Sequence, residues 1–373
     1  MQEIDKDQVL LQALTDATPL LDVRAPVEFA RGAFPTATNL PLLTDAERHE
    51  VGVRYKRTGK VAAIALAESL VSDDVKFMRI KAWQEYIAAN PNAILYCFRG
   101  GLRSRTVQEW LAAEGCHVPR VAGGYKRLRR LMLEALERLC HENDFIVVAG
   151  KTGSAKTHLI NSLPNSVDLE GLAHHRGSSF GRHYHKQPNQ VNFENNLAIA
   201  MLRLEQQQPN KVFLEDESRA IGSLSVPQQL HARMREAPLA VIETTMEERV
   251  QTIMHDYILY TFSEFASVSK DNAPLAFSDH LLEALERIER RLGGEKYRII
   301  REKMVIALDA QFNKQDPQAH AEWIRELLEG YYDPMYDYQL NKKLQRGVFR
   351  GTREEFLRWS AHMDVSQSRR INS

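Results

Sequence analysis

The sequence has 373 residues, 43% of them hydrophobic and 26% charged, which is typical of a globular chain with more than one domain. Lysine plus arginine and aspartate plus glutamate each number 49, so the whole chain lacks the basic excess of a general nucleic-acid binder. The three cysteines have no CxxC or other metal-ligand spacing and fit free thiols in a reducing cytosol, and no run reaches the ~18 apolar residues of a membrane helix.

The first part of the chain alternates short apolar runs with amphipathic segments. Residues 1–7 are polar and do not resemble a signal peptide, so we expect a cytoplasmic protein without a membrane partner. Strands are expected at residues 20–24, 37–42, 93–96 and 118–121. Helices are expected at residues 8–14, 26–32, 45–57, 60–70, 75–90 and 125–143. Such alternation predicts a mostly parallel sheet that binds ligands at the carboxyl ends of its strands.

The third of these strands ends at Cys97, which opens a loop with two glycines, Gly100 and Gly101, and two arginines, Arg99 and Arg103. A helix follows the loop. Backbone N–H groups and positive charge around a thiol lower its pKa and form an anion pocket, so this pattern predicts a nucleophilic thiolate. The alternative is a buried cysteine that merely ends a core strand.

A second α/β unit begins with an apolar strand at 145–149. It leads into Gly150–Thr157, which fits the phosphate-loop pattern G-x-x-x-x-G-K-[ST] except that Ala155 replaces the second glycine. Further strands are expected at residues 167–169, 211–216 and 239–243. Helices are expected at residues 158–163, 192–206, 246–262, 279–293, 295–312 and 317–330. Residues 331–373 are aromatic and basic, with weak periodicity.

The phosphate loop predicts a diphosphate site in which loop N–H groups surround the anion and Lys156 adds a charge. Thr157 and Asp216, an acid at the end of a strand, could together hold Mg²⁺, although no metal site is certain. Arg176 lies in a glycine-rich segment that we expect to cover the diphosphate. The residues predicted to bind the diphosphate are Gly150, Gly153, Ser154, Lys156, Thr157, Arg176 and Asp216.

The first ~140 residues resemble a rhodanese domain. The similarity is carried by the segments 21–24, 28–32 and 39–41 and by the cysteine loop. In many rhodaneses the arginine follows the cysteine by five residues, whereas Arg103 follows Cys97 by six. This longer loop is closer to that of cysteine phosphatases and suits a tetrahedral, phosphate-like anion.

A rhodanese-like domain joined to this phosphate loop and to the segment 169–181 resembles the tRNA 2-selenouridine synthase family. The resemblance implies that 2-thiouridine at the wobble position of tRNA is first alkylated with geranyl diphosphate. The S-geranyl group is then replaced by selenium from selenophosphate. It further implies that Cys97 carries selenium as a selenyl-sulfide, assisted by Arg99 and Arg103 and by an oxyanion loop at Gly100 and Gly101. No tightly bound cofactor is expected.

The expected fold is therefore α/β, with a rhodanese-like domain (1–140), a P-loop NTPase-like domain (141–245) and a helical C-terminal region (246–373). We expect a monomer that binds tRNA through local basic patches. The residues predicted to contact tRNA are Arg105, Lys126, Arg127, Arg129, Arg130, Lys342, Lys343 and Arg346. Two other functions remain open: a rhodanese-type sulfurtransferase, and a P-loop kinase or NTPase with a regulatory rhodanese domain.

Overall fold

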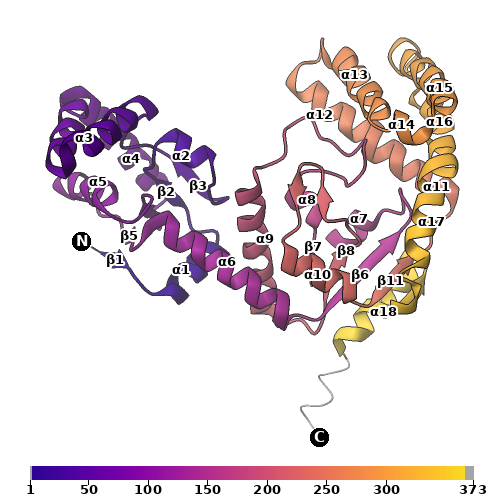
Figure 1. Cartoon of the computed structure of the whole chain (residues 1–373), viewed down its shortest axis with the longest axis horizontal. Helices are drawn as coiled ribbons and strands as arrows, with labels where there is room; N and C mark the ends of the chain where they lie inside the picture. The colour runs from indigo at the N-terminus through magenta and orange to yellow at the C-terminus, as the bar shows by residue number, and fades with distance from the viewer. Residues whose placement is uncertain (1, 366–373) are drawn as a thin grey trace, which may run out of the picture. The chain divides into compact units, whose positions relative to one another are not determined.

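The computed structural model describes residues 2–365 and divides the chain into two compact units (Figure 1). The first unit comprises the residues up to Leu139 together with Asn189–Arg203. The second comprises Cys140–Pro188 and the residues from Leu204 onward. Within the described residues, no helix is both long and apolar enough to cross a membrane.

The first unit is built on a five-stranded parallel sheet in the order β1-β5-β4-β2-β3. Its strands are β1 (Glu3–Ile4), β2 (Leu20–Asp22), β3 (Ala37–Asn39), β4 (Ile94–Tyr96) and β5 (Arg120–Val121). Strands β2 and β4 are buried along their whole length, as expected for the centre of a sheet covered on both faces. Because β2 and β4 are neighbours and parallel, Asp22 and Tyr96 end side by side, and Cys97 follows at the same edge.

The helices of the first unit are α1 (Asp7–Thr15), α2 (Pro26–Ala30), α3 (Asp45–Leu70), α4 (Asp73–Ala89), α5 (Leu102–Ala113) and α6 (Gly124–Glu142). Helix α3 starts at a capping box, in which Thr44 and Glu47 exchange hydrogen bonds between side chain and backbone. It is interrupted at Gly59, where φ is +81°, between the two helices expected from the sequence. Trp83 of α4 and Leu111 of α5 are buried in the core beneath β2 and β4.

Helix α9 (Gln190–Gln207) extends the first unit, although the sequence on both sides of it belongs to the second. Asn195, which is fully buried, donates to the carbonyl of Ala33, and Arg203 donates to the carbonyl of Thr15. From the sequence, residues 141–245 were expected to form a single domain. The boundary differs because the contacts of α9 are made with residues far away in the sequence.

The second unit contains a five-stranded parallel sheet in the order β12-β11-β6-β8-β7. Its strands are β6 (Phe145–Gly150), β7 (Ser166–Val167), β8 (Val212–Glu215), β11 (Leu239–Ile242) and β12 (Gly347–Gly351), and a separate hairpin joins β9 (Ala220–Ile221) to β10 (Leu224–Ser225). Strand β12 corrects the expectation of a wholly helical C-terminal region, because it comes from the tail and pairs with β11.

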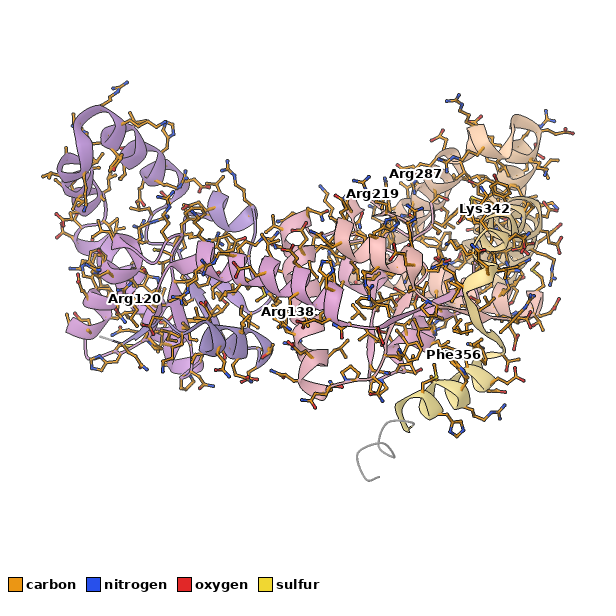
Figure 2. The ribbon with its side chains drawn as sticks, turned by 60° about the horizontal axis from the view of Figure 1, so that its bottom comes forward. Arg120, Arg138, Arg219, Arg287, Lys342 and Phe356 are labelled. Atoms are coloured by element: carbon orange, nitrogen blue, oxygen red, sulfur yellow. The ribbon has the colours of Figure 1, made fainter. Side chains whose placement is uncertain are left out.

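The helices around this sheet are α7 (Lys156–Asn161), α8 (Leu169–Ala173), α10 (Gln228–Glu236) and α18 (Arg353–Val365). On α18, Phe356 is fully buried and packs edge-to-face on Phe213 of β8 (Figure 2). This aromatic pair fixes the C-terminal segment to the central sheet.

Most of the other helical elements of the second unit share one hydrophobic core. The α-helices are α11 (Met246–Ile253), α12 (Thr261–Val268), α13 (Ala273–Glu286), α14 (Glu289–Leu292), α15 (Gly294–Asn313), α16 (His320–Leu327) and α17 (Asp333–Asn341). Two short 3₁₀ turns are η2 (Pro317–Ala319) and η4 (Leu344–Arg346), and two π-helical segments are η1 (Met254–Tyr260) and η3 (Leu328–Tyr332). Such π-helical segments are rare and often lie at functional sites.

Candidate functional site

The cysteine loop joins the buried strand β4 to helix α5. Cys97 is 3% exposed, and its thiol donates to Ser104 Oγ over 3.2 Å. Two backbone hydrogen bonds secure the loop: Tyr125 N–H donates to the carbonyl of Cys97 over 2.9 Å, and Lys126 N–H donates to that of Phe98 over 3.0 Å. The start of α6 therefore holds the cysteine loop in place.

Gly100 and Gly124 make this close approach of two backbones possible. Both have positive φ, +62° and +59°. A Cβ added at Gly124 would lie 2.2 Å from the carbonyl oxygen of Cys97, and one at Gly100 would lie 2.6 Å from Val121 O. Gly101 is different, because a Cβ there would meet nothing within 4 Å. Only the first two positions therefore require glycine.

Arg103 is held by Glu28 of α2, at the same edge of the sheet as the cysteine loop. Its two terminal nitrogens lie 2.5 and 3.1 Å from the two carboxylate oxygens, and Arg48 Nε lies 3.1 Å from Glu28. Burial raises the pKa of Glu28, but hydrogen bonds and the charges of Arg103 and Arg48 outweigh it and hold that pKa below its usual value. Arg103 is thus pre-positioned by a charged partner, whereas Arg99 is exposed.

A buried ion pair between Asp22 and Arg24 lies at the end of β2, next to the cysteine loop. Arg24 Nε lies 2.8 Å and Nη2 2.5 Å from the same oxygen of Asp22, and both residues are essentially fully buried. The guanidinium also lies 3.9 Å from the centre of the Tyr125 ring and donates to the carbonyl of Gly32 over 2.8 Å. Asp22 and Arg24 therefore hold β2, α2 and the start of α6 together.

The phosphate-type loop of the second unit follows β6. Gly153 has a φ of +83°, and a Cβ there would lie 2.7 Å from the carbonyl oxygen of Arg249. Ala155 has a φ of +56°, so it takes up the left-handed conformation that a glycine would adopt more easily. The replacement of glycine by Ala155 therefore leaves a left-handed residue at this point of the loop.

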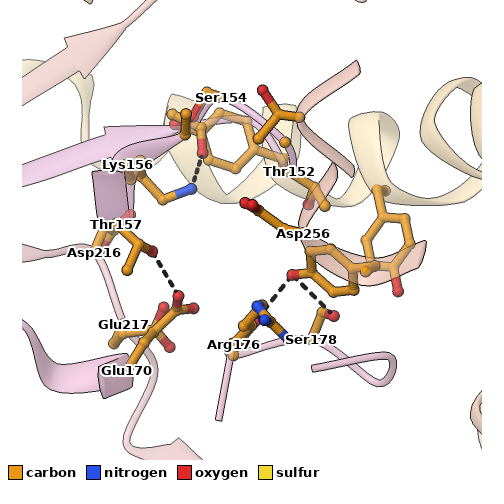
Figure 3. Close-up of a pocket in the computed structure, with 18 of the residues that line it drawn as sticks. Thr152, Ser154, Lys156, Thr157, Glu170, Arg176, Ser178, Asp216, Glu217 and Asp256 are labelled. Carbon is orange, nitrogen blue, oxygen red and sulfur yellow. Dashed lines mark hydrogen bonds between the residues drawn. The ribbon is translucent and has the colours of Figure 1, made fainter. Parts of the chain in front are cut away.

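All seven residues predicted to bind a diphosphate line one cavity of about 710 Å³, which is large enough for a small-molecule ligand (Figure 3). Lys156 Nζ donates to the carbonyl of Gly150 over 2.7 Å, and Ser154 Oγ is buried without a partner. Arg176 donates to Thr261 Oγ1 over 3.2 Å and lies above the rings of Tyr257 and Tyr260. A lysine, an arginine and an unpartnered hydroxyl thus surround the same space.

Glu170 lines the cavity and bonds to the loop, and Glu215 lies behind it. Thr157 Oγ1 donates to Glu170 Oε2 over 2.7 Å, and the backbone N–H of Glu170 donates to Glu215 over 3.1 Å. Glu215 is 1% exposed, and its other carboxylate oxygen has no partner. Burial, together with the charges of Glu170 and Asp168, raises the pKa of Glu215 to about 8.

A third carboxylate, Glu217, belongs to the same cluster. Burial and the neighbouring charges of Glu170 and Glu215 raise its pKa well above the usual value. These glutamates were not predicted from the sequence. For Glu215 and Glu217 the signal was the acidic run at the end of β8, of which Asp216 alone received a role.

Asp216 and Lys343, predicted for different sites, form an ion pair. Lys343 Nζ lies 2.7 and 2.8 Å from the two carboxylate oxygens of Asp216. The hydroxyl of Thr157 points instead to Glu170. Thr157 and Asp216 thus each have another partner in this structure, and within residues 2–365 no group of three or more His, Cys, Asp or Glu side chains could hold a metal ion.

Two histidines that line the cavity, His158 and His255, both bond to the carboxylate of Asp256. His158 Nε2 lies 2.9 Å from one oxygen of Asp256, and His255 Nδ1 lies 2.7 Å from the other. Hydrogen bonding to Asp256 raises the pKa of His158 above its usual value. These residues line the same cavity and were also missed, because residues 98 positions apart in the sequence are brought together only by the fold.

The basic residues predicted to contact tRNA divide into two groups. Arg105, Lys126, Arg130 and Lys342 are exposed, and Lys342 lies 3.9 Å from the centre of the Tyr338 ring (Figure 2 labels Lys342). The others are engaged within the chain: Arg127 with Asp7, Arg129 with Glu194 and Asn195, Lys343 with Asp216, and Arg346 with the carbonyls of Met234 and Ala237. In this structure the side chains of the second group make contacts within the chain that stabilise the fold.

Comparison with known proteins identifies relatives over nearly the whole chain. The family model of the tRNA 2-selenouridine synthase AAA domain matches residues 143–367. The tRNA 2-selenouridine synthase of Marinobacter nauticus is 48% identical, over 95% of this chain and 97% of its own length. The proteins of the same name from Hahella chejuensis and Alcanivorax borkumensis are 47% and 46% identical, over 94% and 92% of this chain and 93% and 96% of their own.

Proposed function

The chain belongs to the tRNA 2-selenouridine synthase family, and from this premise we propose that it replaces the sulfur of 2-thiouridine at the wobble position of tRNA by selenium. The observation that carries the proposal is the presence of two anion-suited loops in one chain. One contains a cysteine with a positioned arginine, and the other gathers Lys156, Arg176 and unpaired polar atoms around a cavity. One loop suits a nucleophile, and the other a diphosphate.

In the first step, the phosphate loop binds geranyl diphosphate. The sulfur of 2-thiouridine attacks C1 of the geranyl chain, the C1–O bond breaks, and diphosphate leaves. The base loses its N3 proton in the same step. Lys156, Arg176 and the loop N–H groups stabilise the charge that develops on the leaving diphosphate, which is electrostatic catalysis that needs no hydrolysis of a nucleotide.

In the second step, the thiolate of Cys97 attacks the phosphorus of selenophosphate. An S–P bond forms as the Se–P bond breaks, and selenium leaves with the electron pair as hydrogen selenide. The selenide attacks C2 of the base, and the geranyl thiol departs. Water then hydrolyses the S–P bond, which releases phosphate and frees Cys97. This route needs no oxidant, whereas a selenyl-sulfide at Cys97 would need a two-electron oxidant. Arg99 and Arg103 balance the charge of the selenophosphate oxygens.

Two substitutions separate the steps. Lys156→Ala should block geranylation and leave 2-thiouridine, whereas Cys97→Ser should permit geranylation and cause S-geranyl tRNA to accumulate. Mass spectrometry of nucleosides from tRNA incubated with each variant measures both products. Lys151→Ala is the matched control in the same loop, because Lys151 pairs with Asp337 over 3.0 Å. Cys116→Ser is the control for the thiol.

The same experiment distinguishes the other two functions. A sulfurtransferase would need Cys97 but not Lys156, and would produce no geranylated nucleoside in any variant. A kinase or NTPase would release phosphate from ATP and would keep that activity in Cys97→Ser. Unaltered formation of 2-selenouridine by Cys97→Ser would contradict the role assigned to the cysteine.

A further inference from the structure

A pocket of about 330 Å³, hereafter the basic pocket, adjoins the phosphate-loop cavity. Four residues line both spaces: Asp216, Glu217, Ser218 and Gln339. Six further residues complete the basic pocket: Arg219, His231, Met234, Arg235, Lys343 and Arg346. They come from the loop after β8, from α10 and from the segment before β12, so three stretches that are distant in the sequence meet at this point.

Cations outnumber anions around the basic pocket. The carboxylates of Asp216 and Glu217 face four permanent positive charges, which belong to Arg219, Arg235, Lys343 and Arg346. Asp216 is already paired with Lys343 through both of its oxygens. Burial and the charges of three of these cations lower the pKa of His231, which lies among them. The pocket therefore has a surplus of positive charge.

Two of the four cations have no partner that would occupy them. Arg219 and Arg235 are exposed, and neither side chain forms a hydrogen bond or ion pair with another residue in the described part of the chain (Figure 2 labels Arg219). By contrast, Arg346 donates through Nη1 to two backbone carbonyls, and Lys343 is paired with Asp216. The guanidinium donors of Arg219 and Arg235 are thus available to an anionic ligand.

We propose that the basic pocket binds a backbone phosphate of the tRNA, next to the nucleotide whose base enters the phosphate-loop cavity. The inference rests on the proposed function and names a part of the second unit that holds the RNA strand. A nucleotide joins a neutral base to an anionic phosphate through one sugar, so a base in the large cavity has its phosphates close by. The planar donor groups of arginine match phosphate oxygens in geometry as well as in charge.

The construction of the basic pocket suits a strand better than a free phosphate. The phosphate loop surrounds its anion with backbone N–H groups in one tight turn. The basic pocket instead presents side chains of three separate segments, and Arg219 and Arg235 are exposed to solvent. A polymer can enter and leave such an open site. Contacts of this kind fix the position of the strand without reading its bases.

Removal of the two available charges tests the assignment. Arg219→Gln with Arg235→Gln should weaken binding of an anticodon stem-loop RNA to the full chain about tenfold and lower the slope of log affinity against log salt by about 1. Binding of inorganic pyrophosphate should not change, because neither arginine lines the large cavity. Fluorescence anisotropy and calorimetry measure the two affinities. Arg301→Gln is the matched control, because Arg301 is exposed on α15 and lines neither space.

A neutral linkage in the RNA locates the bound phosphate. A methylphosphonate placed in turn on the 5′ and the 3′ side of the wobble 2-thiouridine removes one charge at a time. One of these two linkages should weaken binding to the wild-type chain about tenfold, and the same linkage should cost the double variant no further affinity.

Five results would overturn the proposal. They are wild-type RNA affinity in the double variant, an equal loss in Arg301→Gln, no effect of either neutral linkage on the wild type, the same loss from that linkage in wild type and double variant, and weaker pyrophosphate binding by the double variant. The last result would show a site for free phosphate compounds. None of these measurements requires geranyl transfer, so their failure is distinct from the absence of a geranylated nucleoside, which would refute the proposed function.

Discussion

Lys343 neutralises Asp216 by donating to both of its carboxylate oxygens, at 2.7 and 2.8 Å. Asp216 follows the interior strand β8, and Lys343 lies in the tail just before β12. The pair therefore ties the C-terminal segment to the edge of the sheet that carries the phosphate loop. Arg249 adds a similar link, since it bonds to Asp333 of α17 and to the carbonyl of Thr152 in the loop.

The first prediction concerns the strength of this pair. Lys343→Met and Asp216→Asn should each lower the free energy of unfolding, and a double-mutant cycle should find about 1 kcal/mol of coupling, since both side chains are only partly exposed. Urea unfolding of the four proteins measures it. A role of Lys343 in binding tRNA would appear instead as weaker tRNA binding by Lys343→Met at unchanged stability.

The second prediction compares two glycines of the first unit. Gly124→Ala should destabilise the chain by about 2–3 kcal/mol, because its Cβ would collide with the carbonyl of Cys97 and its φ is +59°. It should also impair the selenium step more than geranylation. Gly101→Ala, with φ at −94° and no neighbour within 4 Å, should change stability by less than about 0.5 kcal/mol. Thermal unfolding and nucleoside analysis of both variants test this. Equal losses of stability in the two variants would show that the close contact between the start of α6 and the cysteine loop is not required.

The third prediction separates exposed from engaged cations in tRNA binding. Arg105→Gln with Lys126→Gln should weaken binding and reduce the slope of log affinity against log salt by about 1 per lost phosphate contact. Arg129→Gln should instead lower stability, because Arg129 bonds to Glu194 and Asn195 of α9. Binding isotherms at several salt concentrations measure the slope. An unchanged slope in the double variant would remove Arg105 and Lys126 from the interface.

The features that follow from local sequence were predictable. The phosphate loop lies within eight consecutive residues, and its position between a strand and a helix is evident from the apolar run before Gly150. The same holds for Cys97, which follows a short buried strand. The break at Gly59 was also expected, because glycine in a helix interior is unfavourable.

Features that depend on distant pairing were not predictable in this way. Lys343 and Asp216 form an ion pair although they are 127 positions apart in the sequence, and no pattern near either residue indicates the partner. Strand β12 has exposed residues and lies at the edge of the sheet, so its sequence lacks the apolar run that marks β6. Basic residues such as Arg129 are predicted equally well as solvent-exposed or paired, and only the fold decides between them.

The last prediction concerns the pH dependence of stability. Glu215 has a pKa of about 8 in the folded chain, above its usual 4.5, so the folded state keeps a proton that the unfolded state has already lost. Stability should therefore fall as the pH rises from about 4.5 to about 8, and level off above that. Glu215→Gln removes the ionisable group, so its stability should fall less over this range and exceed that of the wild type at pH 9 by more than about 1 kcal/mol. Urea unfolding between pH 5 and pH 9 measures the difference, with the exposed Glu236→Gln on α10 as the control. Parallel profiles for wild type and Glu215→Gln would show that Glu215 ionises normally in the folded chain.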